Sequence, residues 1–301
     1  AKLVVEPGAR MVFDSAGVLS MSSGGLLDAR GTAANPIVFT SDNGATRRWF
    51  GIKHFTSTDA DTSYISHALV EYTGHGNNHG ITAQGALLMD SVRVRQGGAI
   101  IMEGRSRFRW STLDTVTTLT GQRGVDMYDS TTFEASTVRK VADVGVHAQC
   151  CKIKLLGGRI EDATGIGVVM NSGPPAALLP FKIVGSASFP YNNVDASFVP
   201  TLFPTAASYD SIRGNAFDSL LVSGTIPTSY TLPKGYPWIA GLLGVADGTT
   251  FTIAPGAGIA FSSQMFSVGG RLYSVGTLTD TIVLKARDPS APFGGIKFQA
   301  A

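Results

Sequence analysis

The chain of 301 residues has a net charge of +2, and charged residues make up 15% of it. This near-neutral balance excludes partners that are bound through charge alone, such as nucleic acid or an acidic membrane surface. The 36 glycines and the low charge favour short strands joined by tight turns, and no apolar run reaches the ~18 residues of a transmembrane span. The two cysteines, Cys150 and Cys151, are adjacent, so a bond between them is strained and no disulfide framework is predicted.

The first predicted element is a block of apolar-rich segments around a Pro-Gly pair. It consists of Leu3–Phe13 (LVVEPGARMVF), Gly24–Asp42 (GGLLDARGTAANPIVFTSD) and Trp49–Phe55 (WFGIKHF). Alternating apolar residues predict short strands, and glycine permits the turns between them. We call this segment the first Pro-Gly block.

A ladder of apolar positions follows, with a period near 22 residues. Two columns keep the same spacings, and a third lies beside Gly-rich turns. The first column is Ile65, Leu87, Phe108, Phe133 and Leu155; the second is Val70, Val92, Leu113, Val138 and Ile160; the third is Ile100, Val125, Val146 and Ile166. A short strand cannot bury its inward face alone, but stacked coils pair every strand and fill the centre. The ladder therefore predicts an all-β fold, a right-handed parallel β-helix with three short strands per coil.

The ladder is interrupted once. We predict β-helix coils over residues 1–171, an irregular insertion rich in Pro and aromatic residues over 172–211, and further coils over 212–301. Five prolines disfavour central strands in the insertion. They are Pro174, Pro175, Pro190, Pro200 and Pro204.

A second copy of the Pro-Gly block lies in the last coils. Phe251–Phe261 (FTIAPGAGIAF) repeats the opening, Gly269–Arg287 matches Gly24–Asp42 at an offset of 245 residues, and Phe293–Phe298 repeats Trp49–Phe55. The duplicated pattern resembles the first coils of secreted and surface-exposed bacterial β-helix proteins of the pectate-lyase-like architecture. This resemblance implies a parallel β-helix and an extracellular or cell-surface location. It does not imply lyase activity.

The outermost coils raise the question of what covers them. No amphipathic helix or polar cap is evident beside Leu3 and Val5 or beside Ile296 and Phe298. Uncovered strands offer unpaired N–H and C=O groups to another strand. The open alternatives are a fragment of a longer repeated protein, copies stacked head to tail through these four residues, and capping by loops.

Arginines recur with period two at Arg93 and Arg95, and again at Arg105, Arg107 and Arg109. Their alternation with apolar residues places them on the outer face, where they form a candidate site for an acidic polysaccharide or phosphate. The alternative is a solvated outer face in which these arginines pair with neighbouring acids such as Asp90 or Asp114.

The sequence gives weaker support to the other candidate sites. His75 and His79 lie in a Gly/Asn loop without a third metal ligand. The carboxylate pairs have no acidic column behind them, so glycoside cleavage and a calcium ion are not supported, and we expect no cofactor. These pairs are Asp59 with Asp61, Asp126 with Asp129, and Glu161 with Asp162.

Aromatic residues in or after the insertion either bind sugars or, as we favour, pack against the solenoid. They are Tyr191, Tyr209, Tyr230, Tyr236 and Trp238.

The sequence thus favours a non-catalytic, extracellular structural protein that assembles head to tail with copies of itself. A carbohydrate-binding or polysaccharide-degrading β-helix protein is the alternative, with the arginines as its anionic subsite. A phage tail-fibre or tailspike segment, which requires a trimer, is the third hypothesis.

Overall fold

A computed structural model describes residues 1–22, 24–55, 62–77, 79–116, 123–149, 152–171, 175–262 and 264–299. The predicted all-β parallel solenoid is confirmed, with about 11 turns, about 7% helix and three parallel sheets. The chain divides into two compact units, Ala1–Ala187 and Ser188–Ala301, which we call unit 1 and unit 2. Cys150, Cys151, Asp59 and Asp61 lie outside the described residues.

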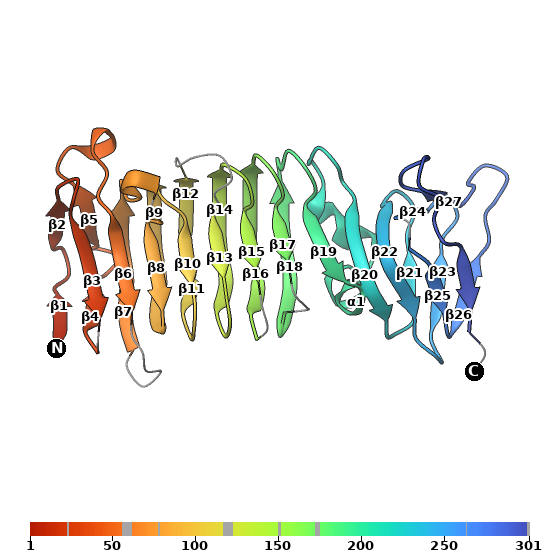
Figure 1. The fold of residues 1–301 in the computed structure, drawn as a ribbon, viewed down its shortest axis with the longest axis horizontal. Coiled ribbons are helices and arrows are strands. Elements are labelled where there is room, and N and C mark those ends of the chain that lie inside the picture. The colour runs from red at the N-terminus through yellow and green to blue at the C-terminus, as the bar shows by residue number, and fades with distance from the viewer. Residues whose placement is uncertain are drawn as a thin grey trace. The chain divides into compact units, whose positions relative to one another are not determined.

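Unit 1 is built from parallel strands that stack coil upon coil (Figure 1). Its elements are β1 (Lys2–Val5), β2 (Arg10–Phe13), β3 (Val18–Ser22), β4 (Leu26–Arg30), β5 (Ile37–Ser41), the 3-10 turn η1 (Gly44–Thr46), β6 (Gly51–Phe55), β7 (Thr62–Glu71), η2 (His75–Asn77), β8 (Ile81–Gln84), β9 (Ala86–Gly97), β10 (Ile100–Met102), β11 (Arg107–Arg109), β12 (Thr112–Val116), β13 (Val125–Met127), β14 (Thr132–Val141), β15 (Val146–Ala148), β16 (Lys154–Ala163), β17 (Val168–Met170) and β18 (Ala177–Val184). The long-strand sheet runs β1-β4-β7-β9-β11-β14-β16-β18, and the short-strand sheet of unit 1 runs β3-β6-β8-β10-β13-β15-β17.

The inward columns confirm the predicted ladder, but their register differs at one coil. Ile65 faces Met89, and Val70 faces Val94, so the predicted places of Leu87 and Val92 are wrong by two residues. The reason is uneven coil length, because the column steps 24 positions from Ile65 to Met89 and 19 from there to Phe108.

A shift of two residues keeps each side chain on the same face, so the apolar pattern alone does not separate the two registers. Ile166 is misplaced in the same way. The third column continues from Val146 to Val168.

Two corners of the coils in unit 1 are formed by residues with left-handed backbone. One corner is His67, Ser91, Trp110 and Ala135, and the other is Tyr72, Gln96, Thr115, Lys140 and Asp162. Each such residue costs about 1–2 kcal/mol when it is not glycine, so glycine is the residue that corner geometry predicts. Beside the first corner, backbone N–H groups donate to serine hydroxyls of the next coil instead of to backbone carbonyls. The Val92 N–H donates to Ser111 Oγ (2.9 Å), and the Ser111 N–H donates to Ser136 Oγ (3.0 Å).

Unit 2 contains a short helical excursion followed by regular coils. Its elements are β19 (Tyr191–Asp195), η3 (Ala196–Phe198), α1 (Val199–Leu202), η4 (Ala206–Ile212), β20 (Leu220–Ile226), β21 (Tyr230–Leu232), β22 (Trp238–Val245), β23 (Thr250–Ile253), β24 (Gly258–Phe261), β25 (Phe266–Val268), β26 (Arg271–Ser274), β27 (Val283–Ala286) and β28 (Ile296–Phe298). The ladders between its described strands are parallel.

The segment predicted to be irregular, 172–211, is partly regular. β18 pairs with β16 over seven positions, and β19 pairs with β20 across a bulge. The first of these strands tolerates Pro180 because the ladder passes over that position, where Leu179 and Phe181 pair on either side. Only the part from Ala196 to Ile212 turns into short helices.

The aromatic residues of this region pack inward, as the packing interpretation predicts. Tyr191, Tyr209, Tyr230, Tyr236 and Trp238 are all buried. Tyr209 and Tyr230 share a hydrogen bond between their hydroxyls (2.8 Å), and Trp238 Nε1–H donates to the Tyr209 hydroxyl (3.2 Å). These polar tips are therefore satisfied inside the unit, and none of the five rings is available as a sugar platform.

The two Pro-Gly blocks fold alike down to their hydrogen bonds. In the first block β1, β2 and β3 pair with β4, β5 and β6; in the second β23, β24 and β25 pair with β26, β27 and β28. The Gly8 N–H donates to the Asn35 carbonyl (3.0 Å), and the Gly256 N–H donates to the Asp280 carbonyl (3.1 Å). Gly8 and Gly256 both have left-handed backbone, which explains the repeated Pro-Gly pair.

Candidate functional site

The predicted arginine strip lies on the outer face of the long-strand sheet, where acids accompany it. Asp90 binds both Arg107 and Arg109, with N–O distances of 3.1 and 2.8 Å. Arg95 pairs with the buried Glu71 at 2.6 Å, while Arg105 also has an interaction partner. The pairing predicted for a solvated outer face is therefore present.

A modest positive excess nevertheless remains near Arg93. Its partner Asp114 lies 3.3 Å away and is held more closely, at 2.6 Å, by Arg139. The hydrogen bond from Arg139 is the main cause that lowers the pKa of Asp114. Arg93 and Arg95 also line a recess of about 260 Å³ together with the exposed His67. The strip's role in anion binding stays a prediction.

The histidine and carboxylate candidates are not brought together as pairs. The His75 ring packs edge-on against Phe50, with ring centroids 5.1 Å apart, while the backbone carbonyl of His79 accepts from Lys53. Glu161 forms an ion pair with Arg159. Asp126 belongs to a hydrogen-bond network of Arg123, His147 and Gln149, whereas Asp129 accepts from the Ser130 hydroxyl.

That network is a polar cluster on the outer face of the short-strand sheet, and the sequence indicated only Asp126 among its members. Asp126 on β13 is 8% exposed and accepts from Arg123 Nη1 (2.8 Å) and Gln149 Nε2 (3.0 Å). His147 on β15 is its register partner and lies 2.8 Å from it through Nδ1. Burial raises the pKa of Asp126, but the hydrogen bonds from His147, Gln149 and Arg123 outweigh it and lower that pKa.

The network fixes the tautomer of His147. An ionised carboxylate only accepts, so Nδ1 of His147 carries the proton given to Asp126. Nε2 then accepts from Asn171 Nδ2 at 2.8 Å. Because both ring nitrogens are engaged, the cluster resembles a structural clamp across three coils more than a general base with a free lone pair.

Lys53 lies further along the same outward column. It stands in the middle of β6 and donates to the His79 carbonyl (2.7 Å) and to Thr82 Oγ1 (3.1 Å). Burial lowers the pKa of Lys53 to about 8. The pKa of His79 is lowered by burial and then by the Lys53 charge, while Asp126 acts in the opposite direction.

A histidine also lies inside the coil. His54 is fully buried, and its Nε2 lies 2.9 Å from Ser63 Oγ. Burial lowers the pKa of His54, and a backbone contact with Gln84 offsets this only in part. In the second Pro-Gly block the equivalent residue is Phe298.

We expect the protein to lose stability as the pH falls below about 6.5, the ordinary pKa of histidine. Below that pH His54 takes up a proton in the unfolded chain but not in the folded one. Protonation therefore stabilises the unfolded state and lowers the free energy of unfolding. The slope approaches about 1.4 kcal/mol per pH unit for one such histidine. Urea unfolding from pH 4.5 to 7.5 measures it.

The variant His54→Phe is expected to reduce this pH dependence, and His79, whose pKa burial also lowers, keeps part of it. His67→Asn, at an exposed left-handed position, is the control substitution of a histidine. An unaltered acid slope in His54→Phe would assign the effect to other groups.

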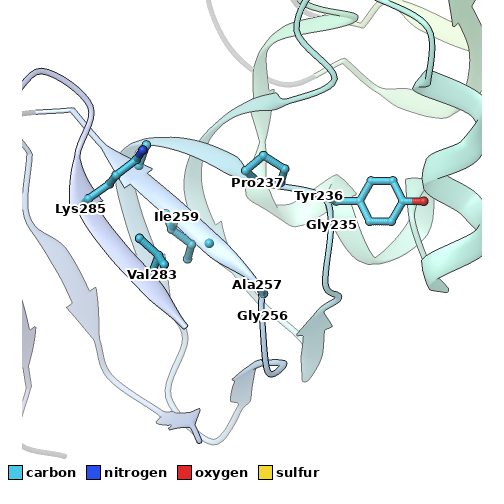
Figure 2. A pocket seen from close by; sticks show the side chains of 10 residues that line it. Gly235, Tyr236, Pro237, Gly256, Ala257, Ile259, Val283 and Lys285 are labelled. Carbon is cyan, nitrogen blue, oxygen red and sulfur yellow. The ribbon is translucent and has the colours of Figure 1, made fainter. Parts of the chain in front are cut away.

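A recess with a mainly apolar lining lies in unit 2 and is about 320 Å³ in volume. Figure 2 shows Val283, Ile259 and Lys285 beside the Gly256 turn, with the Tyr236 ring directed away from them. That ring instead stacks on Tyr209, with centroids 4.3 Å apart. Lys285 is the only charged residue of the lining, so the recess holds no acid–base pair.

The four predicted assembly residues lie on coils with a neighbour on one side only. β1 pairs with β4 alone, and β28 pairs with β25 alone, among the strands described. Leu3 is 41% exposed and Phe298 is 65% exposed, while Val5 is buried and Ile296 is half-buried. A recess of about 350 Å³ lies next to Leu3, between β1 and β3.

In the described ranges, no cluster of three metal-ligating side chains occurs, and no helix is long and apolar enough to cross a membrane. Comparison with family models, with curated proteins and with solved structures gives no match to this chain.

Proposed function

We propose that the chain is a non-catalytic, extracellular structural protein whose solenoid stacks end to end with other copies. One observation carries the proposal. The duplicated block occurs once with a coil above it and once with a coil below it, and each environment supports a way in which a further coil would cover the exposed face of the other copy. The sequence pattern of the block, which resembles secreted bacterial β-helix proteins, supports the extracellular location.

The lower face of the block is covered in unit 2. There β21 and β22 pair with β23, β24 and β25. Phe251 and Phe266, which are equivalent to Leu3 and Leu19, are fully buried as a result. The same inward positions in unit 1 are exposed or half-buried, so a further coil would bury them.

The upper face is covered in unit 1. There β7 and β8 pair with β4, β5 and β6, and Leu27, Ile37 and Ile52 are fully buried. The equivalent Leu272, Ile282 and Ile296 of unit 2 are half-buried. Strand addition to β26, β27 and β28 would satisfy their backbone groups and bury these side chains, and the first coil of a second copy presents parallel strands of the same type.

A glycine substitution tests the proposal. An ideal Cβ on Gly51 lies 1.9 Å from the Gly80 carbonyl oxygen of the coil above, whereas one on the equivalent Gly295 meets nothing within 4 Å. Gly295→Ala is therefore expected to leave the fold intact and to abolish stacking on β28. Gly248→Ala, at a left-handed turn with nothing within 4 Å, is the matched control.

Negative-stain microscopy and light scattering over a concentration series give the measurement. Wild type and Gly248→Ala are expected to lengthen with concentration, and Gly295→Ala to remain short. A wild-type chain that stays monomeric at high concentration, or a closed trimer, contradicts the proposal. The trimer would favour the tail-fibre hypothesis instead.

A carbohydrate-binding role is the second candidate, and the recess beside Arg93 and Arg95 favours it. The positive charge of Arg93 is only partly balanced by Asp114, which Arg139 holds more closely, and this supports an acidic sugar as the ligand. Arg93→Gln is expected to weaken retention on immobilised alginate relative to Lys182→Gln, an exposed cation on β18. Equal retention of the two variants would contradict this candidate.

A further inference from the structure

Lys53 is a partly buried cation for which the described part of the chain supplies no carboxylate. Two other lysines differ, because Lys2 pairs with Asp28 at 2.6 Å and Lys234 pairs with Asp280. A buried charge without a counter-ion is unfavourable. The lowered pKa of Lys53, to about 8, reflects that burial.

Lys53 and Thr82 keep donor groups that the described residues do not use. Its ammonium has three N–H groups, of which two go to the His79 carbonyl and Thr82 Oγ1. Since Thr82 Oγ1 accepts from Lys53, its own O–H remains to donate. The Nδ1 atom of His79 is buried and has no hydrogen-bond partner.

Lys53, Thr82 and the His79 carbonyl meet because of the coil register. Lys53 and Thr82 are paired residues on β6 and β8, about 4.8 Å apart as neighbouring strands are. His79 lies three residues before Thr82 and reaches Lys53 through its carbonyl. Asp126 also acts on the pKa of His79, and this carboxylate already pairs with Arg123 at 2.8 Å.

We propose that Lys53 and Thr82 form a binding site for a small oxyanion, a carboxylate or a phosphate, next to His79 on the outer face of unit 1. The anion supplies a counter-charge that the described residues do not, and it accepts from Lys53 and from the Thr82 hydroxyl. A divalent cation does not suit this site, because the ammonium repels it. The site is independent of end-to-end stacking and goes beyond the proposed structural role.

The second Pro-Gly block provides the matched control. Lys297 is equivalent to Lys53, since both follow the isoleucine of the GIK sequence. Lys297 is exposed, and within the described ranges no hydrogen bond ties it to a threonine or a histidine carbonyl. Lys297→Met therefore removes the same charge from the same block without removing the site.

Isothermal titration of the 301-residue chain with sodium acetate and with sodium phosphate, at constant ionic strength, tests the site. We expect saturable binding that Lys53→Met weakens by about tenfold or more, the loss of one charged partner, and that Lys297→Met leaves unchanged. Tighter binding of acetate assigns a carboxylate ligand, and tighter binding of phosphate assigns a phosphate. Equal binding by wild type and Lys53→Met, or no saturation with either anion, overturns the proposal.

A second measurement does not depend on the variant folding. Lysine residues labelled by reductive ¹³C-methylation are followed by NMR in the wild-type chain. The anion is expected to raise the titration midpoint of the Lys53 signal and to leave that of Lys297 in place. A Lys53 midpoint that the anion does not move contradicts the site.

Discussion

Gly51→Ala is expected to destabilise unit 1 by about 2–5 kcal/mol, and Gly295→Ala to destabilise unit 2 by about 1–2 kcal/mol. Gly51 and Gly295 occupy equivalent positions and have similar backbone, with φ of 97° and 88°. Both substitutions therefore carry the same conformational cost. Only at Gly51 does the new Cβ overlap the backbone of the coil above, 1.9 Å from the Gly80 oxygen. The extra loss of unfolding free energy in Gly51→Ala, compared with Gly295→Ala, therefore measures how closely the next coil packs on β6.

Urea unfolding measures both costs. Fluorescence reports on both units, because Trp49 is buried in unit 1 and Trp238 in unit 2. Equal losses in the two variants would mean that backbone strain accounts for the whole effect, and the stacking of β8 on β6 would then be looser than the structure shows.

The sequence predicts the fold because inward positions repeat in both strand alternation and coil length. Phe108, Phe133 and Leu155 are paired residues of successive coils, as predicted. The exact register of β9 was not predictable, because Val92 and Val94 are both apolar and both point inward. The two registers of β9 are distinguished only by the hydrogen-bonded corners. The left-handed positions at these corners are occupied by many different amino acids, so the sequence does not mark them.

The functional candidates are less visible in the sequence. The arginine strip has a clear period of two, but its ion pairs with Asp90 and Glu71 depend on neighbouring coils. Lys53 lies in the GIK sequence of the repeated block, and this repetition is the only signal it gives. Its partners Thr82 and His79 are recognisable only once β8 is placed beside β6.

Phe133→Ala is expected to cost about 3–5 kcal/mol, as large-to-small substitutions of fully buried rings do. The Phe133 ring is 0% exposed and lies between Phe108 and Phe181, with centroids 5.9 and 5.6 Å away. Rigid backbone ladders on both sides limit how far the cavity can collapse. Phe298→Ala, at the 65% exposed ring, is expected to change stability by only about 0.5 kcal/mol.

A partial rescue distinguishes packing from a general disturbance of β14. Leucine already occupies this column at Leu155, the paired residue of the next coil, so the site accepts its shape. Phe133→Leu is therefore expected to recover more than half of the stability that Phe133→Ala loses, in urea unfolding under the same conditions. If Phe133→Leu and Phe133→Ala are equally unstable, the ring is held by a specific aromatic contact with Phe108 and Phe181. If neither variant is destabilised, the column through Phe133 is not the close-packed centre of the solenoid, and the fold itself would need revision.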